Sequence, residues 1–82
     1  MALWWLSYRT GYQPIGVAIV EAGSLDHARM LAAIGGIDAG LTFTYGHALD
    51  DEQTAMVSQS EIGRFLFLTE ATQVRGRFKT QS

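Results

Sequence analysis

Residues 1–22 predict two strands joined by a turn, from the way apolar and polar positions follow one another. Residues 3–9 combine aromatic and aliphatic side chains, which suit a pleated, half-buried surface. A turn is expected over residues 10–14, where Gly11 can take a positive φ and Pro14 has a fixed φ. Residues 15–21 include four successive apolar positions, which is typical of a central strand covered on both faces.

Two adjacent tryptophans lie in the first of these strands. Neighbouring residues of a strand point to opposite faces of the sheet. This alternation places Trp4, Leu6 and Tyr8 on one face, and Leu3, Trp5, Ser7 and Arg9 on the other. The two indole rings therefore cannot share one core, and the second ring needs cover from a later helix, a second copy of the chain or a ligand. In the second strand, Gly16 leaves room for a ring or another backbone to lie close.

The next pattern predicts a helix. Gly23 ends the second strand and Ser24 is a suitable N-cap. Either Gly35 or Gly36 can end the helix in the left-handed conformation, with Ile37 folding back over the last turn. One apolar stripe at helical spacing lies between these limits, formed by Leu25, Ala28, Leu31 and Ala32.

A third strand and a second helical region are predicted within residues 41–70. Residues 41–45 alternate, which places Leu41, Phe43 and Tyr45 on the core side. Residues 51–70 are expected to form one broken helix or two short ones, and Gly63 disfavours a single straight helix. Two capping boxes mark the helix starts, Asp50 with Gln53 and Ser58 with Glu61.

Residues 71–82 are expected to form a basic strand or an ordered arm, because Val74, Gly76 and Phe78 alternate with basic residues. Together these elements predict a single small α+β domain over residues 1–82. Its sheet has three or four strands in β-β-α-β-α order, with helices packed on at least one face.

Size and composition favour an oligomer. Chains of about 80 residues often need a disulfide, a metal or a partner subunit for stability. Cysteine is absent and there are only two histidines, which leaves a partner subunit as the expected source of stability. Charged residues make up 17% of the chain, below the usual quarter, so one subunit exposes more apolar surface than it can hide.

Charge and hydropathy limit where the protein is expected to be found and which partners it is expected to bind. No segment approaches the roughly 18 apolar residues of a membrane span, and no secretion signal is recognisable, so a soluble cytoplasmic protein is expected. Residues 21–70 hold all eight acids, whereas residues 71–82 hold Arg75, Arg77 and Lys79. One interpretation is that the acidic residues 21–70 simply keep the protein soluble. The other is that the basic residues 71–82 dock on an acidic face of this chain, a neighbouring subunit or another protein. Nucleic acid is disfavoured as a partner because the body is acidic.

Four clusters suggest chemistry, but each has a simpler structural interpretation. The glycine-rich residues 35–40 follow a helix instead of preceding one, so a C-cap is expected there and not a phosphate loop. Ser24 at the helix start could hold an anion, although an ordinary N-cap is the simpler interpretation. His47 with Asp50, Asp51 and Glu52 has no distinctive metal-ligand spacing, and His27 beside Ser24 or Asp26 cannot form a catalytic triad within one turn. No catalytic residue, metal or cofactor is therefore predicted.

Aromatic residues near the N-terminus form the remaining candidate site. They suggest a platform that stacks a planar ligand or a peptide, with arginines available for a negative group. The predicted ligand- or partner-binding residues are Trp4, Trp5, Tyr8, Arg9, Tyr12, Ser24, Arg75 and Arg77.

Several segments resemble a group of small uncharacterised proteins of bacteria and their phages. They are Leu6-Ser7-Tyr8, Gly16-Val17-Ala18-Ile19-Val20-Glu21-Ala22, Gly36-Ile37-Asp38-Ala39-Gly40 and Arg64-Phe65-Leu66. The likeness covers most of residues 3–70, and its motifs are structural. It implies the β-β-α-β-α order and carries no activity.

Three hypotheses on function follow. The leading one is a non-enzymatic, homo-oligomeric binding module that engages or inhibits a partner protein. The alternative is a protein that binds or sequesters a small nucleotide-like ligand between subunits, with Trp4 or Trp5 stacking the base. The third is a small hydrolase that uses His47 and an acid, and it requires a convergent pocket around that histidine.

Overall fold

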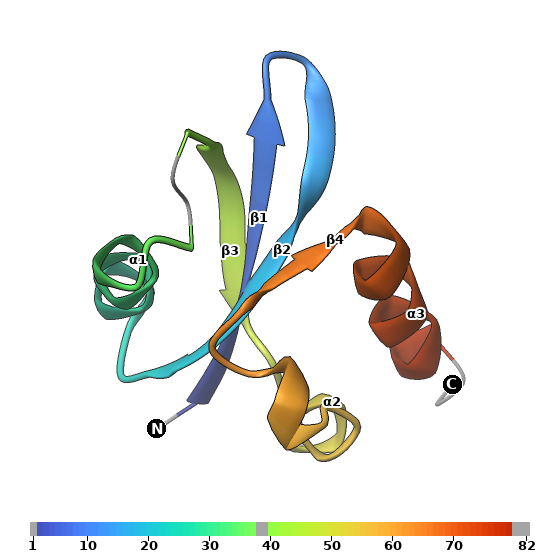
Figure 1. The fold of residues 1–82 in the computed structure, drawn as a ribbon. Helices are drawn as coiled ribbons and strands as arrows, with labels where there is room; N and C mark the ends of the chain where they lie inside the picture. The colour runs from blue at the N-terminus through green and yellow to red at the C-terminus, as the bar shows by residue number, and fades with distance from the viewer. Residues whose placement is uncertain (1, 38–39, 80–82) are drawn as a thin grey trace.

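Four strands form one antiparallel sheet in the order β3-β1-β2-β4, with helices packed against it (Figure 1). The structure, a computed structural model, describes residues 2–37 and 40–79. The predicted α+β class is confirmed, and the sheet has a fourth strand. The elements in chain order are β1 (Ala2–Thr10), β2 (Gln13–Ala22), α1 (Leu25–Ile34), β3 (Thr42–Ala48), α2 (Asp51–Ala55), the 3₁₀ helix η1 (Gln59–Glu61), β4 (Phe65–Phe67) and α3 (Leu68–Lys79).

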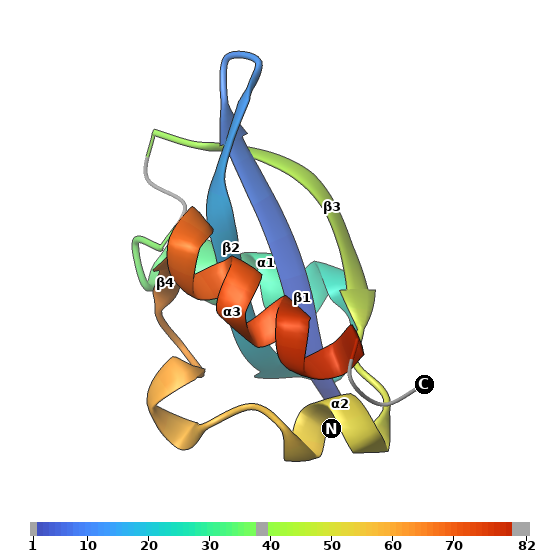
Figure 2. The ribbon, with the colours of Figure 1, turned by 90° about the vertical axis from the view of Figure 1, so that its right-hand side faces the viewer.

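The sheet carries one hydrophobic core on each of its two faces. α1 packs on one face, here called the α1 face, over Leu6 and Ala18. α3 packs on the other, the α3 face, over Val17 and Ile19. Figure 2 shows α3 in front of the sheet and α1 behind it. The continuous apolar run of β2 is explained by this arrangement, because both faces of that strand are covered.

The two tryptophans lie on opposite faces, as the alternation predicts. Trp4 is half-buried on the α1 face, where its indole Nε1 donates to the backbone oxygen of Ala22 at 3.0 Å. Trp5 is only 2% exposed and belongs to the core of the α3 face. Its cover therefore comes from the later helix of the same chain, which is one of the alternatives that the sequence left open.

α1 begins and ends at the predicted caps. Ser24 Oγ accepts a hydrogen bond from the backbone N–H of His27 at 3.2 Å. At the other end, Gly36 has a φ of +72° and the N–H of Ile37 donates to the oxygen of Ala32 at 2.9 Å. These bonds form the Schellman motif that glycine allows after a helix. The predicted C-cap is confirmed, while Asp38 and Ala39 lie outside the described residues.

The prediction of one broken helix or two short ones over residues 51–70 holds for the first part of this range and is wrong for residues 65–67. Both capping boxes form, but they start only the short helices α2 and η1. Gly63, with a φ of +81°, ends this region and the chain then adds β4 to the edge of β2. The close approach of β4 depends on Gly16, because an added Cβ there would overlap the backbone oxygen of Leu66. Long-range pairing with β2 thus decides the structure of residues 65–67.

The prediction of a strand or arm for residues 71–82 is also wrong for the residues that the structure describes. Residues 71–79 belong to the helix α3, and residues 80–82 lie outside the described part. Ala71, Val74 and Phe78 share the helical spacing i, i+3, i+7, and all three pack in the core of the α3 face. The alternation that suggested a strand starts at Val74 and leaves out Ala71. Including Ala71 favours the helical spacing over the strand spacing of two.

Candidate functional site

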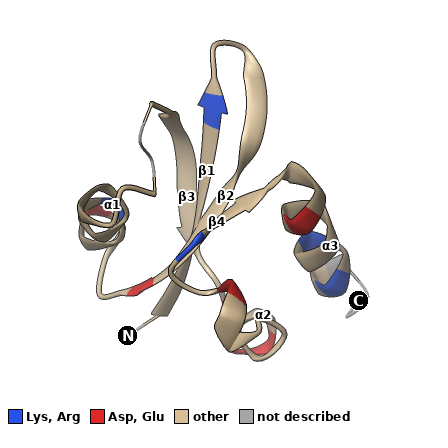
Figure 3. Cartoon of the chain, in the orientation of Figure 1, with Lys and Arg blue, Asp and Glu red and all other residues tan. Residues whose placement is uncertain are grey.

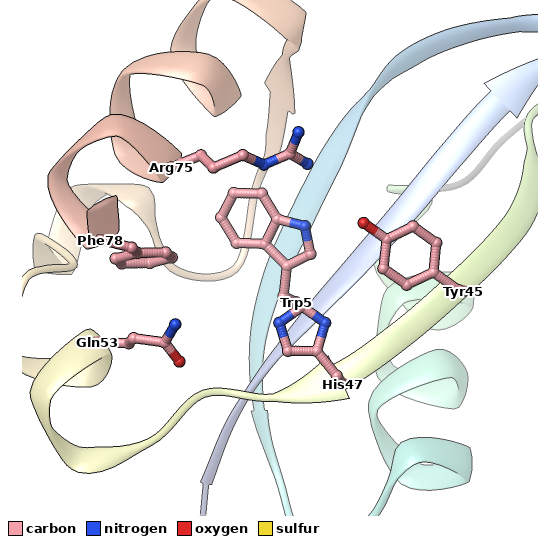
Figure 4. A pocket seen from close by; sticks show the side chains of 6 residues that line it. All are labelled: Trp5, Tyr45, His47, Gln53, Arg75 and Phe78. Atoms are coloured by element: carbon pink, nitrogen blue, oxygen red, sulfur yellow. The ribbon is translucent and has the colours of Figure 1, made fainter. Parts of the chain in front are cut away.

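A cleft opens on the α3 face, where α3, β3 and α2 approach the end of β1 (Figure 4). Its volume is about 300 Å³. We call it the aromatic cleft, because most of its side chains are rings. It is lined by Trp5, Tyr45, His47, Gln53, Arg75 and Phe78.

A β-bulge in β3 directs two of these rings into the cleft. Adjacent residues of β1 pair with Phe43 and Tyr45, so Thr44 is an extra residue in β3. Phe43 consequently packs in the core of the α1 face, whereas Tyr45 and His47 line the cleft. The prediction that Tyr45 shares the core side with Leu41 and Phe43 is wrong for this reason. Bulges commonly re-aim a side chain beside a functional site.

The rings of the cleft form two pairs, and Figure 4 shows Trp5 between Phe78 and Tyr45. Trp5 and Phe78 meet edge to face, with ring centroids 5.7 Å apart. Tyr45 and His47 stack nearly parallel, at 6.1 Å and 10°. The Arg75 guanidinium lies over the Trp5 ring, 5.4 Å from its centroid. A planar group in the cleft would lie beside aromatic side chains and one cation.

The position of Arg75 and Phe78 depends on how α3 is held. Arg77 donates to both carboxylate oxygens of Glu61, at 2.8 and 3.1 Å, and also to the backbone oxygen of Met56. The Glu61 side chain is 11% exposed. The hydrogen bonds from Arg77 lower the pKa of Glu61 against the opposing effect of burial. For Arg77, the expected docking of the basic end on an acidic group of the same chain is thus observed.

A second ion pair ties the other end of α3. Arg64 donates to both oxygens of Glu70, and its Nε donates to the backbone oxygen of Ser60 at 2.7 Å. Both side chains of this pair are more than 40% exposed. Figure 3 shows acidic and basic positions along α3. α3 is therefore anchored at both ends.

A second hollow of about 260 Å³ continues from the cleft along α3, and the two share Tyr45 and Arg75. Polar side chains of β1, β3 and α3 line it, among them Ser7, Thr44 and Thr72. Ser7 Oγ is buried and has no hydrogen-bond partner within the described residues. Most buried hydroxyl groups in proteins have a hydrogen-bond partner, so Ser7 Oγ is an unusual feature of this hollow.

Of the predicted site residues, the structure brings together only Trp5 and Arg75 in the aromatic cleft. Tyr8 lies in the core of the α1 face and also borders the second hollow. Tyr12 is fully exposed at the tip of the β1–β2 hairpin, where the Arg9 side chain donates to the backbone of Gly11. The other predicted residues have structural contacts already described, namely Trp4 with Ala22, Ser24 with His27 and Arg77 with Glu61.

Sequence reasoning missed Tyr45, His47, Gln53 and Phe78 as residues of the aromatic cleft, and Ser7 as a residue of the second hollow. The one available signal was the helical spacing of Ala71, Val74 and Phe78, which would have placed the Phe78 ring over the sheet. The bulge that redirects Tyr45 and His47 has no clear sequence signal.

The remaining chemical hypotheses find no support in the described residues. Over residues 2–37 and 40–79, no group of three or more His, Cys, Asp or Glu side chains could hold a metal ion. Asp50 serves as the cap of α2, and its Oδ1 accepts from Gln53 N at 2.7 Å. His47 does line a pocket, but that lining contains no carboxylate for the hydrolase hypothesis. Across the same residues, no helix is long and apolar enough to cross a membrane.

Comparisons with known proteins identify no family for this chain. No family model matches this chain, and neither the curated proteins nor the solved structures give a match. The resemblance to small bacterial and phage proteins stays a prediction.

Proposed function

We propose that this chain is a binding protein that holds a small anion with an aromatic body in the aromatic cleft. The observation that supports this most is the convergence of four rings and one guanidinium on a single opening (Figure 4). Ligand pockets combine apolar and aromatic walls with a few polar groups that set orientation. Gln53, Tyr45 and His47 supply such polar groups here.

The charge of the cleft favours an anionic ligand. Arg75 is the sole charged group of the lining that the structure describes, and within residues 2–37 and 40–79 it forms no ion pair. Its guanidinium instead lies over the Trp5 ring. A guanidinium recognises carboxylates and phosphates with paired N–H donors. A bound anion would supply the counter-charge that Arg75 lacks.

The volume favours a ligand with a single ring system. About 300 Å³ lies at the lower end of the range of small-molecule pockets. A nucleoside monophosphate or an aromatic carboxylate combines one planar body with one anionic group, so these are the classes to test first. The proposed ligand site keeps Trp5 and Arg75 from the predicted nucleotide-like site. Trp4 cannot stack the same ligand, because it lies on the opposite face of the sheet.

A partner protein is less well supported as the ligand. The large exposed hydrophobic residues are spread over separate elements: Tyr12 on the hairpin tip, Met30 and Ile34 on α1, Tyr45 on β3, and Phe67 and Leu68 where β4 meets α3. α1 and α3 lie on opposite sides of the sheet (Figure 1). A protein interface generally needs one continuous patch.

The proposal is tested by titrating the protein with a panel of nucleoside monophosphates, their uncharged nucleosides, benzoate, indole-3-carboxylate and inorganic phosphate, followed by calorimetry. At least one aromatic anion is expected to bind, and its uncharged counterpart and phosphate alone are expected to bind much more weakly. The Arg75→Gln variant should lose about tenfold or more in affinity, because a hydrogen bond to a charged group contributes about 1.5–3 kcal/mol.

Arg29→Gln is the matched control. Arg29 also lies over an aromatic ring, 4.2 Å from the centroid of Phe43, but on the α1 face. The Arg29→Gln variant removes one positive charge, as Arg75→Gln does, but far from the cleft. It should therefore leave the affinity for the aromatic anion unchanged. Equal losses in the two variants would show that only net charge matters, and no binding by any aromatic anion would reject the proposal.

A further inference from the structure

We infer that two copies of this chain pair through their β3 edges, antiparallel and with the two-fold axis at Gly46, to form one continuous sheet. This inference depends on the strand edge and not on the proposed ligand. It would bring the two aromatic clefts together on one face of the sheet.

β3 is the more exposed of the two sheet edges. The strand order places β3 at one end and β4 at the other. β4 has three residues and leads directly into α3, whereas β3 has seven. In Figure 2, β3 forms the outer edge of the sheet and no other strand lies along its far side, while α1 packs beside it on the α1 face (Figure 1). An edge of this length presents N–H and C=O groups that another strand can pair with.

The backbone of β3 shows which groups face outward. The N–H of Leu49 donates to the oxygen of Leu3 at 2.8 Å, so residue 49 faces β1. In an antiparallel ladder, successive residues direct their N–H and C=O groups alternately to the two sides. Gly46 and Ala48 therefore direct theirs away from β1, toward the open edge. An antiparallel copy centred on Gly46 can exchange both hydrogen bonds with that residue.

The side chains of β3 suit a copy of the same strand. Residues 42–48 contain no Lys, Arg, Asp, Glu or Pro, which are the residues that commonly prevent edge pairing. A two-fold axis through Gly46 places Tyr45 opposite His47 of the second copy, the same pair of rings that stacks within one chain. No like charges meet across the axis. The bulge at Thr44 ends the regular stretch on one side, so pairing spans residues 44–48, with the outward N–H of Ala48 opposite Thr44 of the second copy.

Pairing in this way extends the binding site. Tyr45 and His47 line the cleft from β3, the strand nearest to the axis. The corresponding rings of the second copy would continue the same wall, because opposite residues of paired strands share a face. Each copy would then supply aromatic surface to the margin of the other copy's cleft.

The test is sedimentation velocity from low to high micromolar concentration, on the wild type and on the Ala48→Pro variant. The wild type is expected to form a dimer and the variant to remain a monomer. Proline removes the outward N–H of residue 48 and no bond within the chain, so the monomer should fold, which circular dichroism checks. Phe67→Lys on the opposite edge is the control and should still form dimers.

Amide hydrogen exchange on the wild type gives a second readout that needs no variant. The amides of Gly46 and Ala48 should exchange more slowly as the protein concentration rises, while exposed amides of α1 should not change. A monomer at every concentration would overturn the inference. A dimer that survives Ala48→Pro but is lost with Phe67→Lys would also overturn it and would assign the interface to β4. Neither result bears on ligand binding, which the calorimetry measures separately.

Discussion

Trp4 and Trp5 are neighbours in the chain, yet strand alternation gives them different roles. The Trp4 ring lies against α1, and its indole N–H is bonded to the backbone of Ala22. The Trp5 ring lies beneath α3, in contact with Phe78 and Arg75. Only Trp5 lines the cleft, so a signal from each indole can report separately on each face of the sheet.

The bond between Glu61 and Arg77 predicts a pH dependence of stability. Arg77 lowers the pKa of Glu61 in the folded protein from its ordinary 4.5. A lowered folded pKa means that the stabilisation is fully present above the unfolded pKa and is lost as the pH falls through the folded one. The free energy of unfolding in urea should therefore fall between neutral and acid pH, and Glu61→Gln should make this fall smaller.

Glu70→Gln is the control for that pH series. Glu70 also has a pKa lowered by an arginine, Arg64, but both side chains are largely exposed. Solvent screens exposed ion pairs, so they contribute little to stability. The control should leave stability at neutral pH nearly unchanged. A larger loss from Glu70→Gln than from Glu61→Gln would contradict the assignment of Glu61 as the main anchor of α3.

At the scale of elements, α3 gives a direct test of helix against strand. Gly76 lies in α3 with no other atom within 4 Å of an added Cβ. Alanine is more favourable than glycine inside a helix by about 0.5–1 kcal/mol. Gly76→Ala should therefore stabilise the protein by about that amount in thermal unfolding. A loss of stability would indicate that residues 71–79 are not helical in solution.

Gly16 gives the opposite result for a steric reason. Its added Cβ would overlap the backbone of Leu66 and also press on the Phe65 ring, so β4 would have to move away from β2. Overpacking of this kind costs about 1–3 kcal/mol and sometimes more. Gly16→Ala should lower the urea midpoint clearly. An unchanged midpoint would show that β4 contributes little to the fold.

The sequence predicted the elements whose signals are local and missed those that depend on distant partners. The hairpin of β1 and β2 and both caps of α1 follow from alternation, turn residues and capping residues. β4 could not be predicted, because its three residues become a strand only by pairing with β2. The site was predicted only through Trp5 and Arg75, since the bulge at Thr44 decides where Tyr45 points.

At the scale of the whole molecule, two helices on opposite faces enclose a sheet and leave β3 uncovered at one side. α3 packs on β2 and β4, so the part of its face next to β3 stays open and forms the aromatic cleft. The open edge and the cleft therefore both involve β3. This places the proposed ligand site and the proposed contact between copies beside each other.

The most direct test of the central claim is a two-dimensional proton–nitrogen NMR titration with the best-binding aromatic anion. The account predicts that the indole signal of Trp5 and the amide signals of Tyr45, His47 and Arg75 shift in proportion to occupancy. The indole signal of Trp4, which lies on the opposite face, should stay in place. Shifts centred on Trp4 and α1, with the signals of the cleft unmoved, would contradict the account.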